Sequence, residues 1–302
     1  MNPATHLDQA GGMPLGMQQK APVPPPKPVA VPAVSPLLKD IPKVAAAATP
    51  ALPKPTGPSY EKYLTTTTSN RICALLYGKA CSGKTTGALT FPNPIVIDID
   101  GNLPPGTPNV IPIHSDKFID SVMPRQGRPY SDRLGALTKI SADLAHDLGP
   151  DRTIILDSIT RLEMHYTYQD KFSPILVKKG DNAGEIDTRA MWYRRLDYFQ
   201  GLLNRLVSCS ANVIIISHIQ MERDDKGNLT NQFRQVLMGQ IGDQLPSLFP
   251  TCLYAQSMPG KDGKIEFVWQ IKTGKFQEPA RVPKPTDKNY IPQDYNILKE
   301  FH

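Results

Sequence analysis

The sequence contains 302 residues, of which 31 are prolines, and carries a formal net charge of +6. No apolar run approaches the roughly 18 residues that a membrane-spanning helix requires, and no charged and then apolar leader stands at the N-terminus. The composition therefore excludes a membrane-embedded protein. We expect a cytoplasmic protein with no membrane partner.

The cysteines and the net charge restrict the compartment, the kinds of site and the partners that the protein can have. Cys73, Cys81, Cys209 and Cys252 show no C-x-x-C pairing, which disfavours a zinc site and a disulfide framework and fits a reducing compartment. Residues 1–58 carry five lysines against two aspartates, so the remainder of the chain contributes only +3. That charge is compatible with a nucleic-acid partner and also with an ordinary solvated surface.

The first 58 residues differ in composition from the rest. They hold 14 of the 31 prolines, with almost no aromatic residues and no apolar periodicity, so they cannot bury enough surface to offset the entropy of ordering. We expect residues 1–58 to be a disordered Pro/Ala-rich arm, either a tether or docking peptide or a passive tail. Residues 59–278 are predicted to form one domain and residues 279–302 a C-terminal tail.

From residue 71 onward, short apolar runs alternate with segments of helical periodicity. The apolar runs predict buried strands at residues 71–77, 95–99, 109–113, 153–157 and 212–217. Apolar residues spaced by three or four predict helices over about 131–148, 159–169 and 187–207. Two later runs, 251–257 and 264–272, flank a Pro-Gly-Lys-Asp-Gly turn and predict a hairpin. This order predicts an α/β fold with a mainly parallel sheet covered on both faces and a C-terminal β-hairpin.

A phosphate-binding motif follows the first predicted strand. Residues 78–85 match G-x-x-x-x-G-K-[ST], between an apolar strand and a helix start. The glycines let backbone N–H groups converge on phosphates, Lys84 would reach the β- and γ-phosphates, and Thr85 would offer its hydroxyl to Mg²⁺. The alternative is a glycine-rich turn without a ligand. We predict a site for ATP and Mg²⁺ formed by Gly78, Lys79, Ala80, Cys81, Ser82, Gly83, Lys84, Thr85 and Thr86.

Polar side chains stand at the ends of three further predicted strands. Asp157 ends the fourth strand and either holds the metal together with Thr85 or caps the following helix. Asp98 and Asp100 share one face of the second strand, and Asp100 lies nearer the carboxyl end, where ligands bind in such sheets. Asp100 either positions the attacking water or forms a turn before the next glycine. His218 follows the fifth strand and either senses the γ-phosphate or is an ordinary loop histidine.

Four motifs, taken in their order along the chain, resemble the RecA-type ATPase core. They are the loop at 78–85, Ile-Asp-Ile-Asp100, Ile-Leu-Asp157-Ser158 and Ile-Ile-Ser217-His218. More closely, they are similar to phage-encoded RecA-like, AAA-type nucleotide-binding proteins, including the Sak-type single-strand annealing group. The likeness covers about residues 70–275. It implies a three-layer RecA-like P-loop NTPase with a Walker B pair at 157–158. It also implies that Asp100 takes the place of the family's water-polarising Glu, with one methylene fewer.

The resemblance also implies partners. In RecA-like proteins the loops after the Walker B helix and after the sensor strand face DNA, which places them here at about 171–185 and 220–235. Both contain cations that could follow a phosphate backbone, interrupted by acidic residues. A homo-oligomer is implied, and the arm could contact a single-strand-binding protein. A further cluster belongs either to this surface or to a helix with its arginines in solvent: Arg189, Trp192, Tyr193, Arg194 and Arg195.

One function and two alternatives follow. We expect a Mg-ATP-dependent ATP hydrolase acting on single-stranded DNA in phage recombination or replication, in the cytoplasm of a bacterial host. Catalysis, by in-line attack of water on the γ-phosphate, is assigned to Lys84, Asp100, Asp157 and His218. A small-molecule phosphotransferase would need a lid and an acceptor pocket, and the sequence shows no arginine-rich lid segment. A non-hydrolysing ATP-dependent scaffold would use the arm to recruit partners.

Overall fold

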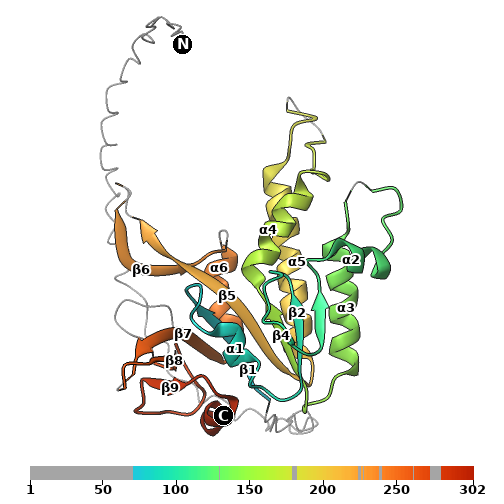
Figure 1. The fold of residues 1–302 in the computed structure, drawn as a ribbon. Coiled ribbons are helices and arrows are strands. Elements are labelled where there is room, and N and C mark those ends of the chain that lie inside the picture. The colour runs from blue at the N-terminus through green and yellow to red at the C-terminus, as the bar shows by residue number, and fades with distance from the viewer. Residues whose placement is uncertain are drawn as a thin grey trace, which may run out of the picture. The chain divides into compact units, whose positions relative to one another are not determined.

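Nine strands of the described residues join one sheet, which is parallel through its central part (Figure 1). The computed structural model describes residues 71–128, 130–178, 182–223, 226, 228–237, 240–260, 262–272 and 280–302. The predicted arm, residues 1–58, lies outside them. The strands are β1 (Cys73–Gly78), β2 (Pro94–Asp98), β3 (Val110–Pro112), β4 (Thr153–Asp157), β5 (Asn212–Arg223), β6 (Leu229–Gln235), β7 (Thr251–Pro259), β8 (Ile265–Gln270) and β9 (Tyr290–Pro292).

The order of the strands gathers the predicted site residues. Along the sheet the order is β3-β2-β4-β5-β1-β7-β8-β9, and β6 pairs with β5 outside this path. The strands from β3 to β7 in this order are parallel, whereas β8 and β9 run antiparallel. Gly78 of β1 is in register with His218 of β5, and Asp98 of β2 with Asp157 of β4. The carboxyl ends of β1, β2 and β4 and the end of the parallel part of β5 therefore bring the four residues to one edge of the sheet.

The strands pack into hydrophobic layers on both faces. In β1, Leu75 and Tyr77 face the larger core, whereas Ala74 and Leu76 face the smaller one. Successive side chains of a strand point to opposite faces, so a strand covered on both sides is apolar throughout. The predicted α/β fold with a mainly parallel sheet is confirmed.

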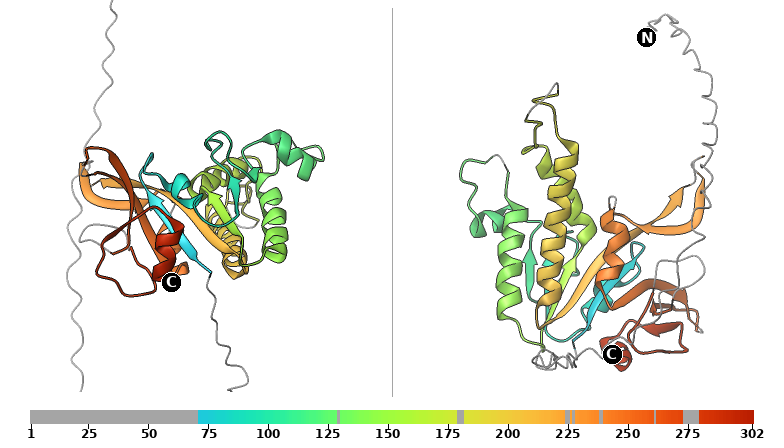
Figure 2. Two further views of the ribbon diagram at one scale, coloured as in Figure 1. Left: turned by 60° about the horizontal axis from the view of Figure 1, so that its bottom comes forward. Right: turned by 180° about the vertical axis from the view of Figure 1, so that it is seen from behind.

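Helices cover both faces of the sheet (Figure 2). They are α1 (Lys84–Ala88), α2 (Asp116–Val122), α3 (Arg133–Asp147), α4 (Ile159–Asp170), α5 (Thr188–Ser208), α6 (Gln240–Gln244), α7 (Tyr295–Leu298) and the 3₁₀ helices η2 (Leu245–Leu248) and η3 (Lys299–Phe301). Buried residues place α3, α4 and α5 against the larger core, and α1 and α7 against the smaller one. Among the described helices, none has the length and apolar character needed to cross a lipid bilayer.

The three longest helices begin where the sequence supplies a cap. The side chains of Asp132, Ser158 and Asp187 each accept a hydrogen bond from the backbone N–H three residues later, at the starts of α3, α4 and α5. Such caps satisfy one of the N–H groups that a helix start leaves without a partner. The predicted helices at 131–148, 159–169 and 187–207 are therefore confirmed to within two residues.

The region after His218 differs from the expected loop. β5 continues to Arg223, beyond the predicted end at residue 217, and forms an antiparallel hairpin with β6. The hairpin extends away from the body of the sheet (Figure 1). Its sequence is largely polar and lacks the apolar run by which a buried strand is recognised, so the sequence pattern missed it.

The C-terminal residues are part of the domain. β9 pairs with β8, and Leu298 and Phe301 are buried in the smaller core. The boundary predicted at residue 278 therefore does not separate a tail from the domain among the described residues. A strand of three residues such as β9 is too short for its periodicity to be recognised from sequence.

Candidate active site

The site begins at the turn between β1 and α1. Gly83 has a φ of +82°, a left-handed conformation that residues with side chains rarely adopt, and α1 begins at the next residue. A Cβ atom on Gly78 would collide with the carbonyl oxygen of Ala255 on β7. Both glycines of the motif are therefore required by the backbone, as expected of a loop that closes around phosphates.

The Lys84 side chain is buried within this loop. Its Nζ donates hydrogen bonds to the carbonyl oxygens of Lys79 at 2.6 Å and Gly78 at 3.1 Å. Burial lowers the pKa of Lys84 to about 8, although attraction to Asp157 and Asp100 opposes the shift. The ammonium group is therefore still protonated at pH 7 and close to two carboxylates.

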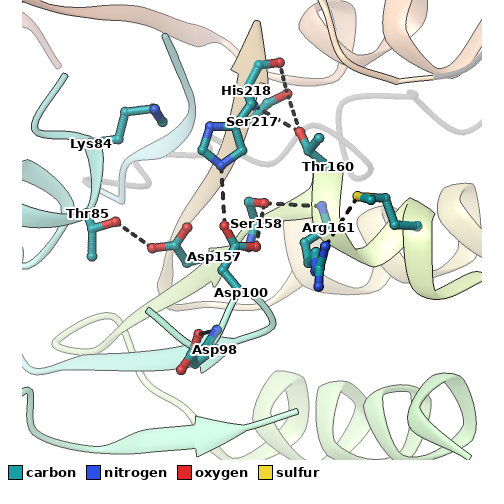
Figure 3. A network of polar contacts seen from close by, with 12 residues as sticks. Lys84, Thr85, Asp98, Asp100, Asp157, Ser158, Thr160, Arg161, Ser217 and His218 are labelled. Carbon is teal, nitrogen blue, oxygen red and sulfur yellow. Dashed lines mark hydrogen bonds and ion pairs between the residues drawn. The ribbon is translucent and has the colours of Figure 1, made fainter. Parts of the chain in front are cut away.

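Thr85 meets the carboxylate at the end of β4. Its hydroxyl donates a hydrogen bond of 2.6 Å to Oδ2 of Asp157 (Figure 3). Asp157 is only 3% exposed, and burial raises its pKa to about 6, against the opposing effect of the Thr85 hydrogen bond. The predicted pair is thus in direct contact.

Asp100 is held by side chains from two other strand ends (Figure 3). Its Oδ1 accepts hydrogen bonds from the backbone N of Ser158 at 3.2 Å and from the Ser158 hydroxyl at 2.9 Å. Its Oδ2 lies 3.4 Å from Nε2 of His218. Burial acts to raise the pKa of Asp100, but the hydrogen bonds with His218 and Ser158 outweigh it and leave the pKa below its usual value. Asp100 is therefore an ionised acceptor at neutral pH.

Asp98 supports the turn that carries Asp100. Its Oδ1 accepts a hydrogen bond of 2.8 Å from the backbone N of Gly101, and its Oδ2 lies 3.1 Å from Nδ1 of His114. The turn before Gly101 is thus closed by Asp98 and not by Asp100, so the turn-forming alternative for Asp100 is wrong. The helix-capping alternative for Asp157 is wrong too, because Ser158 caps α4.

The predicted residues surround one cavity of about 260 Å³. It joins the phosphate-binding loop to Asp100, Asp157 and His218; two residues that sequence reasoning missed, Asn102 and Pro104, complete it. Its lining is Ala80, Cys81, Ser82, Gly83, Lys84, Thr85, Thr86, Asp100, Asn102, Pro104, Asp157 and His218. Gly78 and Lys79 do not line it but accept the Lys84 hydrogen bonds through their carbonyl oxygens.

A glycine loop, a buried lysine and a hydroxyl–carboxylate pair around one cavity are the features that nucleotide-binding domains share. In agreement with this, a family model described as an AAA domain matches residues 70–282. The chain belongs to the AAA domain family. No curated protein matches the sequence. Membership in the AAA domain family indicates a nucleotide-binding ATPase, which usually works with Mg²⁺.

The residues of this AAA domain fit a magnesium ion. Mg²⁺ prefers hard oxygen ligands and often retains water while it is held by one or two protein side chains and the phosphates of its nucleotide. The Thr85 hydroxyl and the Asp157 carboxylate, in contact at 2.6 Å, supply such oxygens next to the loop. They would hold the ion, which supplies charge neutralisation to the phosphates when bound.

Two further contacts were not anticipated. Thr160 of α4 accepts a hydrogen bond of 2.9 Å from the backbone N of His218 and so fixes the end of the site in β5. Gln293, next to β9, donates through Nε2 to the carbonyl oxygens of Ser82 at 2.9 Å and Val268 at 3.1 Å. The Ser82–Gln293 contact joins residues 211 positions apart, so no local motif could have indicated it.

The basic cluster at the start of α5 is mainly structural. Arg194 and Arg195 donate hydrogen bonds to the two carboxylate oxygens of Asp170, at 2.6 and 3.0 Å, and so tie α5 to α4. Arg195 is buried, so the expectation that these arginines lie in solvent is wrong for this residue. Arg189 and Tyr193 are exposed and form a cation–π contact at 5.7 Å.

Proposed function

We propose that this AAA-domain protein is a RecA-like, Mg-ATP-dependent ATPase that acts on single-stranded DNA in phage recombination or replication. The observation that carries the hydrolytic part is the position of Asp100. Its ionised carboxylate shares a cavity with Lys84 and with the Thr85–Asp157 pair, and it lies 3.4 Å from His218. This arrangement combines an acceptor for a water proton, a cation for the phosphates and a polar group, His218, on β5.

Each group has a distinct role in the proposed reaction. Lys84 binds the β- and γ-phosphates and offsets their charge, while Thr85 and Asp157 hold the metal. Asp100 accepts a hydrogen bond from the attacking water and orients it in line with the bond to be broken. His218, hydrogen-bonded to Asp100 from β5, senses whether the γ-phosphate is present. Loss of the phosphate would alter this contact and so the start of the β5–β6 hairpin.

The proposal of single-stranded DNA rests on the resemblance and on the chemistry near the site. The sequence motifs resemble phage RecA-like proteins, and aromatic side chains are exposed at the C-terminal end of α4, which follows the Walker B pair: Tyr168 on α4 is 50% exposed, and Phe172, two residues after α4, is 46% exposed. Exposed aromatic rings beside cations are typical of surfaces on which bases stack. We further propose a homo-oligomer in the bacterial cytoplasm, with the Pro-rich arm as a contact for a single-strand-binding protein.

The test is phosphate release from ATP with and without an oligothymidylate, at two salt concentrations. We expect Mg²⁺-dependent release that the oligonucleotide stimulates, less so at high salt because phosphate contacts are screened. Lys84→Ala should abolish release, whereas Lys139→Ala, at an exposed position on α3, should not. Nucleotide binding without release would instead support a scaffold. Transfer of labelled γ-phosphate to an acceptor other than water would support a phosphotransferase.

A further inference from the structure

A second polar cavity, of about 440 Å³, lies beside α4 and shares no lining residue with the nucleotide cavity. It lies between the outer face of α4 and the segment that contains α2 and the start of α3. Its lining is Asp116, Arg125, Tyr130, Ser131, Arg133, Arg161, Met164, His165 and Tyr168. Three arginines against one aspartate make this lining cationic, and two tyrosines give it an aromatic part.

One of the three arginines has no acidic partner among the described residues. Arg125 pairs with Asp120 at 2.8 Å, and Arg133 pairs with Asp116. For Arg161, in contrast, no carboxylate of the described residues lies within ion-pair distance; its guanidinium contacts the sulfur of Met164 at 3.6 Å. The positive charge of Arg161 is therefore available to a ligand.

His165 adds a polar atom to the same wall. Its Nε2 is buried and has no hydrogen-bond partner among the described residues. Apart from Nε2, the imidazole has a hydrogen bond with the backbone of Ile99. Burial lowers the pKa of His165, and repulsion by Arg133 and Arg161 adds to the shift. The effect of both guanidinium groups on one imidazole agrees with their common position around the cavity. An anion held between them would relieve this repulsion.

Two tyrosines of the lining pack on a third aromatic ring, Phe172. The Tyr168 ring packs edge-on against Phe172, with ring centres 5.1 Å apart, and Tyr130 packs on the same Phe172 at 5.2 Å. Tyr168 and Phe172 are each about half exposed, as is Met164 one turn before Tyr168. A ligand with a flat face and a negative charge would complement exposed aromatic surface next to a cation. A nucleotide unit of single-stranded DNA has both.

We propose that this cavity binds one nucleotide unit of single-stranded DNA, with its phosphate on Arg161 and its base against Tyr168. The inference rests on the proposed function and gives that function a binding site. Its lining contains no residue of the two loops, at about 171–185 and 220–235, that the family resemblance implies, although two of its tyrosines pack on Phe172 at the start of the first loop. An acidic polypeptide would satisfy Arg161 but would leave the Tyr168 ring without a stacking partner.

The site also reaches Asp100 by short connections (Figure 3). The backbone N of Arg161 donates to the Ser158 hydroxyl at 3.2 Å, and that hydroxyl donates to Asp100 at 2.9 Å. His165 hydrogen-bonds the backbone of Ile99, the residue before Asp100. A DNA strand bound at Arg161 and His165 would thus act on the Asp100 carboxylate through two connections, which would couple DNA binding to ATP hydrolysis.

The experiment measures binding of a fluorescein-labelled oligothymidylate to the full chain by anisotropy, over a series of salt concentrations. Arg161→Ala should weaken binding and reduce the slope of log affinity against log salt by about 0.7, the value for one lost phosphate contact on a single strand. Tyr168→Ala should weaken binding about fivefold or more with the slope unchanged, because stacking releases no counterion. Arg161→Lys should keep the wild-type slope, and Tyr168→Phe should keep the affinity.

Arg152→Ala is the matched control. It removes the same charge at an exposed position immediately before β4, at the edge of the sheet opposite the site, and should leave affinity and slope unchanged. If the wild-type chain binds the oligonucleotide and Arg161→Ala and Tyr168→Ala bind as it does, this site is wrong and the proposed function stands. If the wild-type chain does not bind at low salt, the proposed action on single-stranded DNA is wrong as well. Displacement by polyglutamate as readily as by unlabelled oligonucleotide would overturn the site in favour of an acidic polypeptide.

Discussion

The hydroxyl of Thr85 donates a 2.6 Å hydrogen bond to Asp157, a residue 72 positions further along the chain. Thr85 lies at the start of α1, directly after the loop at the end of β1, whereas Asp157 ends β4, and β5 lies between these two strands in the sheet. The contact therefore spans a strand, and His218 of that intervening strand completes the same cavity. This arrangement buries the Asp157 carboxylate, and burial of its charge without a metal costs free energy of folding.

That cost predicts a stabilising substitution at Asp157. The folded-state pKa is raised from 3.8 to about 6, so the stability from protonated Asp157 is present below pH 4 and is lost as the pH rises through 6. At pH 8 the ionised group then costs about 1–3 kcal/mol. Asp157→Asn, which cannot ionise, should raise the free energy of unfolding at pH 8 by up to this amount and change it little at pH 4. Urea denaturation without nucleotide or divalent cations measures both values.

Asp143→Asn serves as the control for this measurement, because Asp143 is exposed on α3. It removes the same charge and should leave the pH dependence of stability as in the wild type. An Asp157→Asn variant that is less stable than the wild type at pH 8 would contradict the assigned cost of burial.

Nucleotide binding should have an optimum between two pKa values. Binding of Mg-ATP needs Asp157 ionised and Lys84 protonated, and their pKa values lie at about 6 and about 8. Affinity for a fluorescent ATP analogue should therefore fall by about tenfold for each pH unit below 6, through loss of the ionised carboxylate, and fall above 8, through loss of the ammonium charge. Asp157→Asn should remove the acidic limb and leave the alkaline one. A flat profile from pH 5 to 9 would contradict both assignments.

Local motifs made part of this site predictable. The sequence of residues 78–85 requires a turn with a left-handed glycine, and the apolar runs before Asp157 and His218 each predict a buried parallel strand. Carboxyl ends of parallel strands meet at one edge of the sheet, so the sequence predicts that Lys84, Asp100, Asp157 and His218 lie together. All four line the same cavity.

The remaining features depend on contacts between distant parts of the chain. The burial of Arg195 depends on Asp170, which lies on the preceding helix, and the support of Ser82 by Gln293 depends on a strand of three residues. The β5–β6 hairpin has the polar sequence of a loop, because β6 and the part of β5 beyond His218 pair with each other outside the path of the central strands. Hydrophobic periodicity in a sequence indicates buried faces, and none of these features has an apolar pattern from which it could be predicted.

Asp100 and His218 should affect hydrolysis more than binding. Asp100→Asn removes the charge that accepts the water proton and should lower kcat for ATP by about 10²-fold or more, with a change in KM of only a few-fold. His218→Ala removes the partner at 3.4 Å and should lower kcat by less, because the Ser158 hydrogen bonds to Asp100 remain. Steady-state phosphate release measures both.

Asp100→Glu tests the difference in length between this residue and the Glu of RecA-like enzymes. If Asp100 positions the water, Glu should retain more activity than Asn, since it keeps the charge. Asp143→Asn again controls for loss of a negative charge. Turnover that survives Asp100→Asn but not Lys84→Ala would mean that another group positions the water.

The last prediction concerns Gln293, which supports the loop from the C-terminal segment. Gln293→Ala removes the hydrogen bonds to the carbonyl oxygens of Ser82 and Val268, at 2.9 and 3.1 Å, and should cost about 1–2 kcal/mol of stability. Because Ser82 lies in the phosphate-binding loop, KM for ATP should rise several-fold while kcat changes less. Urea denaturation and steady-state kinetics separate the two effects.

Gln293→Glu sharpens the test, because it keeps the shape of the side chain but places a negative charge beside two carbonyl oxygens, and it should raise KM further than Ala does. Asn296→Ala, at an exposed position on α7 in the same segment, should leave both KM and stability unchanged. If Gln293→Ala lowers stability but leaves KM as in the wild type, the contact holds the C-terminal segment to the sheet without shaping the loop. The C-terminal segment would then be needed for folding only, and the loop would keep its conformation through Gly78 and Gly83 alone.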